Sequence, residues 1–192
     1  VPSAVSVIPY TYLLRGDLET SLVSSASLYL LALIITPVIT LFFLGTAVNP
    51  LTVLWYIGVL ILVPLAVSRL LRLWNMKPQT RTTFINIAFF ILVLALVGSN
   101  SDAFFGAPIL VISLVAVALV RTFMLGGAVE IFGRRRGIGK SLRAPMVLFT
   151  TYKNAGMAAA LGVALIANEA AVPAAICMTV EVAWFITLKR FV

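Results

Sequence analysis

Six stretches of this sequence are apolar over most of the length that a helix needs to cross a lipid bilayer. A membrane-crossing helix takes about 20 consecutive, mostly apolar residues. We expect six such spans, at Leu18–Leu44, Leu51–Trp74, Thr83–Val97, Phe104–Ile131, Ala144–Ala167 and Ala170–Leu188. A shorter piece, Pro2–Leu14, precedes them and predicts half of a broken helix. The chain is therefore predicted to be an all-α integral membrane protein, and we interpret it as the latter part of a longer one.

The composition supports this class and excludes several soluble ones. Of the 192 residues, 62% are hydrophobic and 10% are charged, and histidine is absent. Soluble domains are roughly 45–50% apolar and about 25% charged, so a soluble core of this size would not hide the excess. A soluble enzyme, a disulfide scaffold, a disordered chain and a nucleic-acid-binding protein are therefore excluded. The single cysteine, Cys177, lies in an apolar run and is interpreted as a core residue.

The basic residues divide the connections between the spans into two groups. Lys and Arg accumulate in the cytoplasmic connections of membrane proteins. The first, third and fifth connections and the C-terminal tail hold twelve of the 14 basic residues, whereas the other connections hold Asp102 and Glu169. The twelve are Arg15, Arg69, Arg72, Lys77, Arg81, Arg134, Arg135, Arg136, Lys140, Arg143, Lys189 and Arg190. We predict a multi-pass protein of the plasma (inner) membrane with a cytoplasmic C-terminus.

A few charges remain that this topology does not explain. Lys153 lies near the middle of the fifth span, Glu181 near the middle of the sixth, and Arg121 in the cytoplasmic part of the fourth. An ionisable group inside a bilayer usually faces a cavity or a partner, because its burial in lipid is costly. We expect an ion pair or close coupling between Lys153 and Glu181, with two separately satisfied structural charges as the alternative. We expect the head of Arg121 to reach the membrane surface, and Glu130 to be interfacial.

Polar and small residues surround Lys153 and predict a break in the fifth span. Non-helical backbone at membrane depth is tolerated where it lines a site. A second polar face follows the half-helix and comprises Thr20, Ser21, Ser24, Ser25 and Ser27. These hydroxyls either coordinate an ion or bond to a neighbouring helix. The candidate binding residues are Lys153, Asn154, Glu181, Ser21, Ser25, Thr150, Thr151 and Gly156.

Two separated motifs carry a resemblance to a known family. The first comprises Pro-Ser-Ala at 2–4, Thr-Tyr-Leu-Leu-Arg-Gly-Asp at 11–17, Ser21 and Pro37. The second comprises Lys-Asn-Ala-Gly-Met-Ala-Ala-Ala-Leu at 153–161, Pro173 and Glu181. Together they resemble the bile acid:sodium symporter superfamily, which includes the arsenite permeases. The resemblance covers the whole chain, from the middle of the family's fourth helix to its tenth.

The resemblance implies a ten-helix fold built from two inverted five-helix repeats. The fourth and ninth helices would be broken and would cross near the middle of the membrane, with substrate between a core and a panel domain. Residues 1–45 and 101–192 would then belong to the core domain, the latter with its middle span broken near 153–156. Residues 46–100 would form part of the panel.

The chain departs from the family at the positions that ligate sodium. The family's Ser-Asn pair falls on Val7 and Ile8, its acidic residue on Phe149, and its Gln on Lys153. Sodium coupling is therefore disfavoured, and the Lys153 ammonium is expected in the place of a cation, which would permit proton coupling. Arsenite is disfavoured as well, because the family's thiol falls on Ser3.

The function that we expect is secondary active transport of a small organic anion by alternating access, coupled to protons or uncoupled. A cationic side chain at a helix break is suited to an anionic group. A sodium-dependent bile-acid-like symporter, an arsenite-type efflux permease, and a membrane channel or scaffold are the alternatives. We expect no enzymatic activity and no resident metal or cofactor. The expected partners are the anion and the lipid bilayer, and nucleic acid is not expected to bind. Substrate identity, direction of transport and oligomeric state are left open.

Overall fold

The computed structural model describes residues 1–45, 49–74 and 77–191 of the chain, and every regular element in that part is a helix. Residues 46–48 and 75–76, which belong to two predicted connections, lie outside the described part, as do the side chains of Arg72 and Arg81. In chain order the elements are α1 (Val7–Leu13), α2 (Leu18–Leu44), α3 (Pro50–Arg72), α4 (Pro78–Ser99), α5 (Ser101–Gly106), α6 (Pro108–Leu119), the π-helical turn η2 (Val120–Met124), α7 (Leu125–Arg135), α8 (Lys140–Thr151), α9 (Ala155–Leu165), the 3₁₀ turn η3 (Asn168–Ala171) and α10 (Val172–Phe191). The prediction of an all-α protein is confirmed for these residues.

Within the described residues, four helical stretches are long and apolar enough to cross a membrane. They are Leu18–Phe43, Pro50–Leu71, Pro108–Arg135 and Asn168–Arg190. The third predicted span falls in α4, where the apolar part is the shorter Phe90–Ser99, and the fifth is divided between α8 and α9. Large apolar side chains point outward from the long helices, including Phe42 and Ile109, which are 80% and 81% exposed. Such surfaces suit a lipid environment and support a membrane protein, whereas the full count of six spans stays a prediction.

The longest helix, α2, begins and ends at the predicted residues, and its start has a clear chemical cause. Asp17 has extended backbone and caps the helix. Its carboxylate accepts the backbone N–H of Thr20 at 3.1 Å and the Thr20 hydroxyl at 2.9 Å. These two hydrogen bonds hold the pKa of the Asp17 carboxyl below its usual range. A capping carboxylate also stabilises the positive end of the helix dipole, so this boundary is well specified by the sequence.

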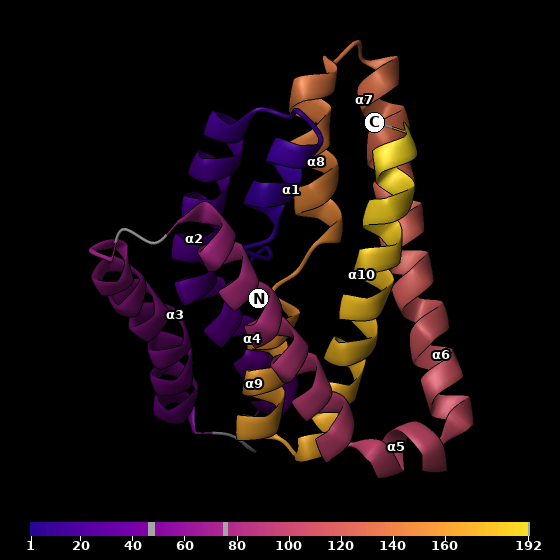
Figure 1. The fold of residues 1–192 in the computed structure, drawn as a ribbon. Coiled ribbons are helices and arrows are strands. Elements are labelled where there is room, and N and C mark those ends of the chain that lie inside the picture. The colour runs from indigo at the N-terminus through magenta and orange to yellow at the C-terminus, as the bar shows by residue number, and fades with distance from the viewer. Residues whose placement is uncertain (46–48, 75–76, 192) are drawn as a thin grey trace.

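Several connections lie at two opposite ends of the bundle (Figure 1). The turn between α1 and α2, the loop between α7 and α8 and the C-terminus lie at the upper end, and α5 and the turn between α9 and α10 lie at the lower end (Figure 1). The upper end therefore carries the basic clusters of the fifth connection and the tail. The lower end carries the two acidic connections. For these connections, the predicted division of charge corresponds to two ends of the structure.

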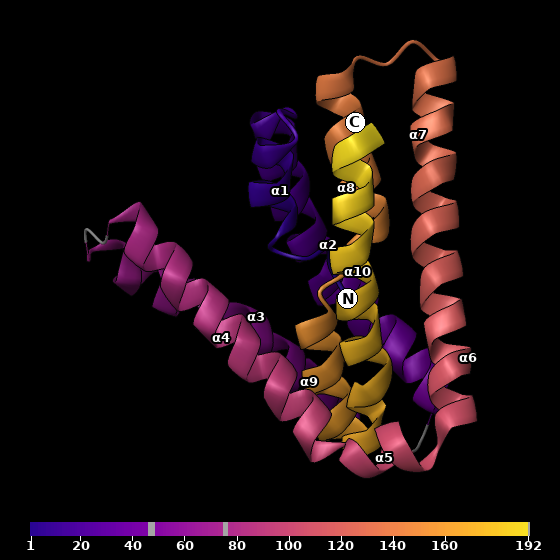
Figure 2. The same ribbon diagram turned by 45° about the vertical axis from the view of Figure 1, so that its right-hand side comes forward.

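Helices α3 and α4 lean away from the upright group formed by α1, α7, α8 and α10 (Figure 2). The α3 side chains Val53, Ile57 and Ile61 are buried against Ala32 of α2 and against Met157 and Leu161 of α9. A separate core joins α1, α8 and α10 and comprises Val7, Leu14, Ala144, Val147, Leu148, Tyr152, Trp184 and Leu188. The broken span thus contributes to both groups, α8 to the upright core and α9 to the leaning pair.

Candidate functional site at the crossing of two extended segments

The N-terminal segment and the segment between α8 and α9 cross inside the bundle. Ser3 and Lys153 form an isolated antiparallel bridge. The backbone N–H of Asn154 donates to the Pro2 carbonyl at 2.9 Å, and that of Ala4 donates to the Tyr152 carbonyl at 3.3 Å. The N-terminus lies beside this segment in both views (Figures 1 and 2). Each segment thus satisfies backbone groups that lipid would leave unpaired, which is the condition for non-helical backbone at membrane depth.

The stretch predicted as the fifth span is interrupted at 152–154, whereas the sequence predicted the break at 153–156. Helix α8 ends at Thr151 and α9 begins at Ala155. Asn154 caps α9, because its Oδ1 accepts the backbone N–H of Met157 at 3.0 Å. Its Nδ2 donates to the Tyr29 hydroxyl on α2 at 3.0 Å. Asn154 therefore fixes where α9 starts and ties that start to α2.

Tyr152 anchors the crossing to α10. Its side chain is almost fully buried, and its hydroxyl donates to the backbone carbonyl of Glu181 at 2.6 Å. The ring packs edge-on against Tyr10 of α1, with the centroids 5.2 Å apart, and Tyr10 in turn stacks on Phe185 of α10. An aromatic residue inside a polar run of the sequence was the available signal for such an anchor.

The ion pair at the crossing joins Glu181 to Arg121, so the prediction of an ion pair between Lys153 and Glu181 is wrong. The Arg121 Nη2 lies 2.8 Å from the Glu181 Oε1. Lys153 contacts the same oxygen through its backbone N–H, at 3.3 Å. Its ammonium instead donates to the Phe149 carbonyl at 3.0 Å. The two residues are coupled, but the side chain of Lys153 turns back toward the end of α8, where carbonyl groups form the negative end of the helix dipole.

The prediction that Arg121 extends to the membrane surface is also wrong. Arg121 belongs to η2, and π-helical turns inside long helices occur frequently at functional sites. Besides Glu181, its Nη2 lies 3.3 Å from the Thr151 carbonyl and 3.3 Å from the hydroxyl of the buried Thr122.

Gly126 follows one turn later, and a Cβ there would meet the Trp184 ring and, at 2.8 Å, the Thr151 methyl group. The small residue lets the fourth span approach the crossing.

The crossing holds two cations and one carboxylate. The guanidinium of Arg121 and the backbone N–H of Lys153 contact Glu181, whose side chain is 5% exposed, whereas that of Arg121 is 30% exposed. Within the described part, four buried polar atoms have no hydrogen-bond partner: the Arg121 Nε, the Trp184 Nε1 and the hydroxyls of Ser3 and Ser25. A site with a surplus of positive charge and unused donors is suited to an anion.

The predicted hydroxyl groups have different fates. Ser21 is buried and exchanges a hydrogen bond of 2.9 Å with Thr11 of α1, so it joins two helices. Ser25 is buried without a partner among the described residues. The hydroxyls of Thr150 and Thr151 donate back to carbonyls of their own helix, at 2.8 and 2.9 Å. Among the four hydroxyls of the candidate binding residues, Ser25 alone is buried without a described hydrogen-bond partner.

Gly156 lies after the extended segment, in the first turn of α9, and a Cβ there would make ordinary contacts.

Glu130 lies near the end of α7 and is buried against two arginines, with its Oε1 2.7 Å from the Nε of Arg134 and 3.2 Å from that of Arg143. Its interfacial depth stays a prediction. The spacing of four residues between Glu130 and Arg134 was the available signal for this pair.

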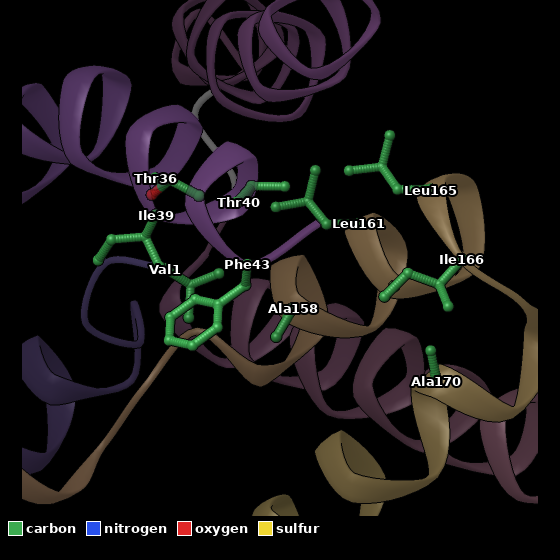
Figure 3. Close-up of a pocket in the computed structure, with 11 residues that line it drawn as sticks. Val1, Thr36, Ile39, Thr40, Phe43, Ala158, Leu161, Leu165, Ile166 and Ala170 are labelled. Carbon is green, nitrogen blue, oxygen red and sulfur yellow. The ribbon is translucent and has the colours of Figure 1, made fainter. Parts of the chain in front are cut away.

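Two cavities flank the crossing along α2. The first, of about 350 Å³, is lined by apolar side chains of α2 and α9, with Thr36 and Thr40 as polar members, and Figure 3 shows these side chains around it. The second, of about 400 Å³, lies between α2 and α8 and is lined by Thr20, Val23, Ser24, Ser27, Leu28, Pro145, Met146 and Phe149. Part of the predicted polar face of α2 therefore borders a cavity.

Among the described residues, no three His, Cys, Asp or Glu side chains come together as a metal site would require. Comparison with family models, with curated proteins and with solved structures finds no match to this chain. The resemblance to the bile acid:sodium symporter superfamily therefore stays a prediction based on the two motifs.

Proposed function

We propose that the protein is a secondary active transporter that carries a small organic anion by alternating access, as a member of the bile acid:sodium symporter superfamily. The observation that supports this most is the crossing of two extended segments beside three charged side chains, of which Glu181 is buried. Transporters place their binding sites at such interruptions, because helix ends and free backbone groups there recognise charged substrates.

The charges favour an anion as the substrate. Lys153 and Arg121 outnumber Glu181, and Lys153 is half-buried on the crossing segment itself. The Lys153 ammonium makes one described hydrogen bond, to the Phe149 carbonyl, although an ammonium carries three donors. It therefore retains donors for a carboxylate or a similar group.

The same proposal includes the coupling and the topology. Sodium prefers several oxygen ligands, and the hydroxyl of Ser21 is already bonded to Thr11, so we propose proton coupling or uncoupled transport. The apolar helices and the charge division favour six spans in the plasma (inner) membrane with a cytoplasmic C-terminus. Residues 1–45 and 101–192 would then move as a core domain against a panel that includes 46–100.

Uptake of anions by the full-length protein in proteoliposomes tests the proposal. The probes are radiolabelled acetate, pyruvate and cholate, measured with an imposed proton gradient, an imposed sodium gradient, or neither. We expect saturable uptake of at least one carboxylate above that of empty liposomes, and no acceleration by sodium. Conduction without saturation would indicate a channel instead, and a steep sodium dependence would contradict the role given to Lys153.

A further inference from the structure

The carboxylate of Glu181 binds the guanidinium of Arg121 in the way that a substrate carboxylate would. The contact between the Arg121 Nη2 and the Glu181 Oε1 is 2.8 Å, the distance of a charge-assisted hydrogen bond. All described hydrogen bonds of the guanidinium leave from Nη2, and its Nε is buried without a described partner. The side chain is nevertheless 30% exposed. An arginine that is partly accessible and only partly satisfied is able to exchange one carboxylate for another.

The titratable groups around Glu181 come from η2, the crossing segment, α1 and α10 itself. Arg121 faces it from η2, Tyr152 and Lys153 from the crossing segment, and Tyr10 from α1. Cys177 lies one turn earlier on α10 itself. Helices α4, α6 and α9 contact α10 through apolar side chains in the described part. The cations that stabilise a charged Glu181 are therefore Arg121 and Lys153, and Arg121 alone contacts it through its side chain.

We propose that Glu181 is an internal stand-in for the substrate, and that its displacement couples transport to protons. A substrate monocarboxylate binds the Arg121 guanidinium in place of Glu181. The displaced Glu181 carboxylate takes up one proton from the same side of the membrane, and both move across together. On release the anion departs, Glu181 loses the proton, and it returns to Arg121. This inference rests on the proposed function and adds to it the coupling group and the substrate class.

The burial of Glu181 is the reason why its displacement from Arg121 leads to its protonation. A buried carboxylate that loses its ion partner is far less stable charged than neutral. Protonation therefore accompanies displacement, and the charge of the site is the same before and after. For a monocarboxylate the cycle carries one anion and one proton, so a gradient of one pH unit would support about tenfold accumulation.

Two measurements on the full chain test this inference. The first is proton uptake by the purified protein in weakly buffered detergent at pH 7, on addition of whichever of acetate, pyruvate or cholate it transports. We expect about one proton per protein molecule for the wild type and none for Glu181→Gln. The second is accumulation of the same anion in proteoliposomes under a gradient of one pH unit, which we expect Glu181→Gln to lose.

Glu130→Gln is the matched control, because Glu130 is also a buried glutamate paired with arginine but lies at the upper end of the bundle. We expect it to take up protons and accumulate anion as the wild type does. Transport by the wild type without proton uptake would overturn the inference while leaving the proposed function intact, whether or not Glu181→Gln folds. Accumulation by Glu181→Gln equal to that of the wild type would overturn it as well. If no probe anion is transported at all, the proposed function itself fails.

Discussion

The coupling free energy between Arg121 and Glu181 distinguishes this ion pair from the pair of Lys153 and Glu181 that the sequence predicted. At 2.8 Å and an effective dielectric constant of about 20, Coulomb's law gives an attraction of about 6 kcal/mol. Desolvation of Glu181 offsets much of this, and the 30% exposure of Arg121 reduces it further. We expect a coupling free energy of about 2 kcal/mol between the two side chains, within the usual range for buried neighbours.

Substituting Arg121 and substituting Glu181 should lower the free energy of unfolding by different amounts. Arg121→Gln leaves Glu181 buried without its partner, and we expect it to lower the free energy of unfolding by about 3 kcal/mol. Glu181→Gln should cost less, because the exposed part of Arg121 is solvated and its Nη2 keeps the Thr151 carbonyl. The double variant should be about 1 kcal/mol less stable than Glu181→Gln alone, which corresponds to the coupling of about 2 kcal/mol.

A double-mutant cycle measured by unfolding in mixed detergent micelles tests these values. The comparison cycle pairs Lys153→Met with Glu181→Gln. Its coupling should be the smaller one, since Lys153 contacts Glu181 through a backbone N–H that the substitution retains. If the cycle with Lys153 shows the larger coupling, the ion pair assigned to Arg121 is refuted.

Three further predictions follow from the packing and the topology. Gly126→Ala should lower the thermal stability of the detergent-solubilised protein, because its Cβ would overlap the indole ring of α10, whereas Gly127→Ala, with open space around it, should leave stability equal or slightly higher. Asn154→Ala should lower stability by about 1 kcal/mol, since α9 loses its cap, and Asn154→Ser should recover most of that loss in the same unfolding assay. In a cysteine-free background, Gly137→Cys and Glu169→Cys should react with an impermeant maleimide from opposite sides of the membrane, the first from the cytoplasm. Labelling of both from one side would contradict the topology.

The sequence was most informative where residues close together in the chain set the boundaries of a helix. Asp17 and Thr20 form a local cap, and the apolar run after them continues unbroken, so α2 has the predicted bounds of Leu18–Leu44. The break before α9 was predicted for a similar reason, because Lys153 and Asn154 interrupt an apolar span. Both features depend on residues a few positions apart.

The charge partners were harder to predict because they depend on helix rotation. Lys153 and Glu181 lie at similar depth on neighbouring spans, but depth does not determine which side chain faces the other. Arg121 is 60 positions from Glu181, and its direction depends on the π-helical turn, which no pattern in the sequence indicates. The contact between Ser3 and Lys153 joins residues 150 positions apart, and the resemblance, rather than any local pattern, suggested it.

The central claim is that an organic anion is carried across the membrane at the crossing that holds Lys153. The most direct test is counterflow of the transported probe carboxylate in proteoliposomes that contain the wild type, Lys153→Met or Lys140→Met. Lys140 is exposed at the start of α8, far along that helix from the crossing, and serves as the control. We expect counterflow at the level of empty liposomes for Lys153→Met, with a normal yield of inserted protein, and wild-type counterflow for Lys140→Met. Wild-type counterflow in Lys153→Met would refute transport at this crossing.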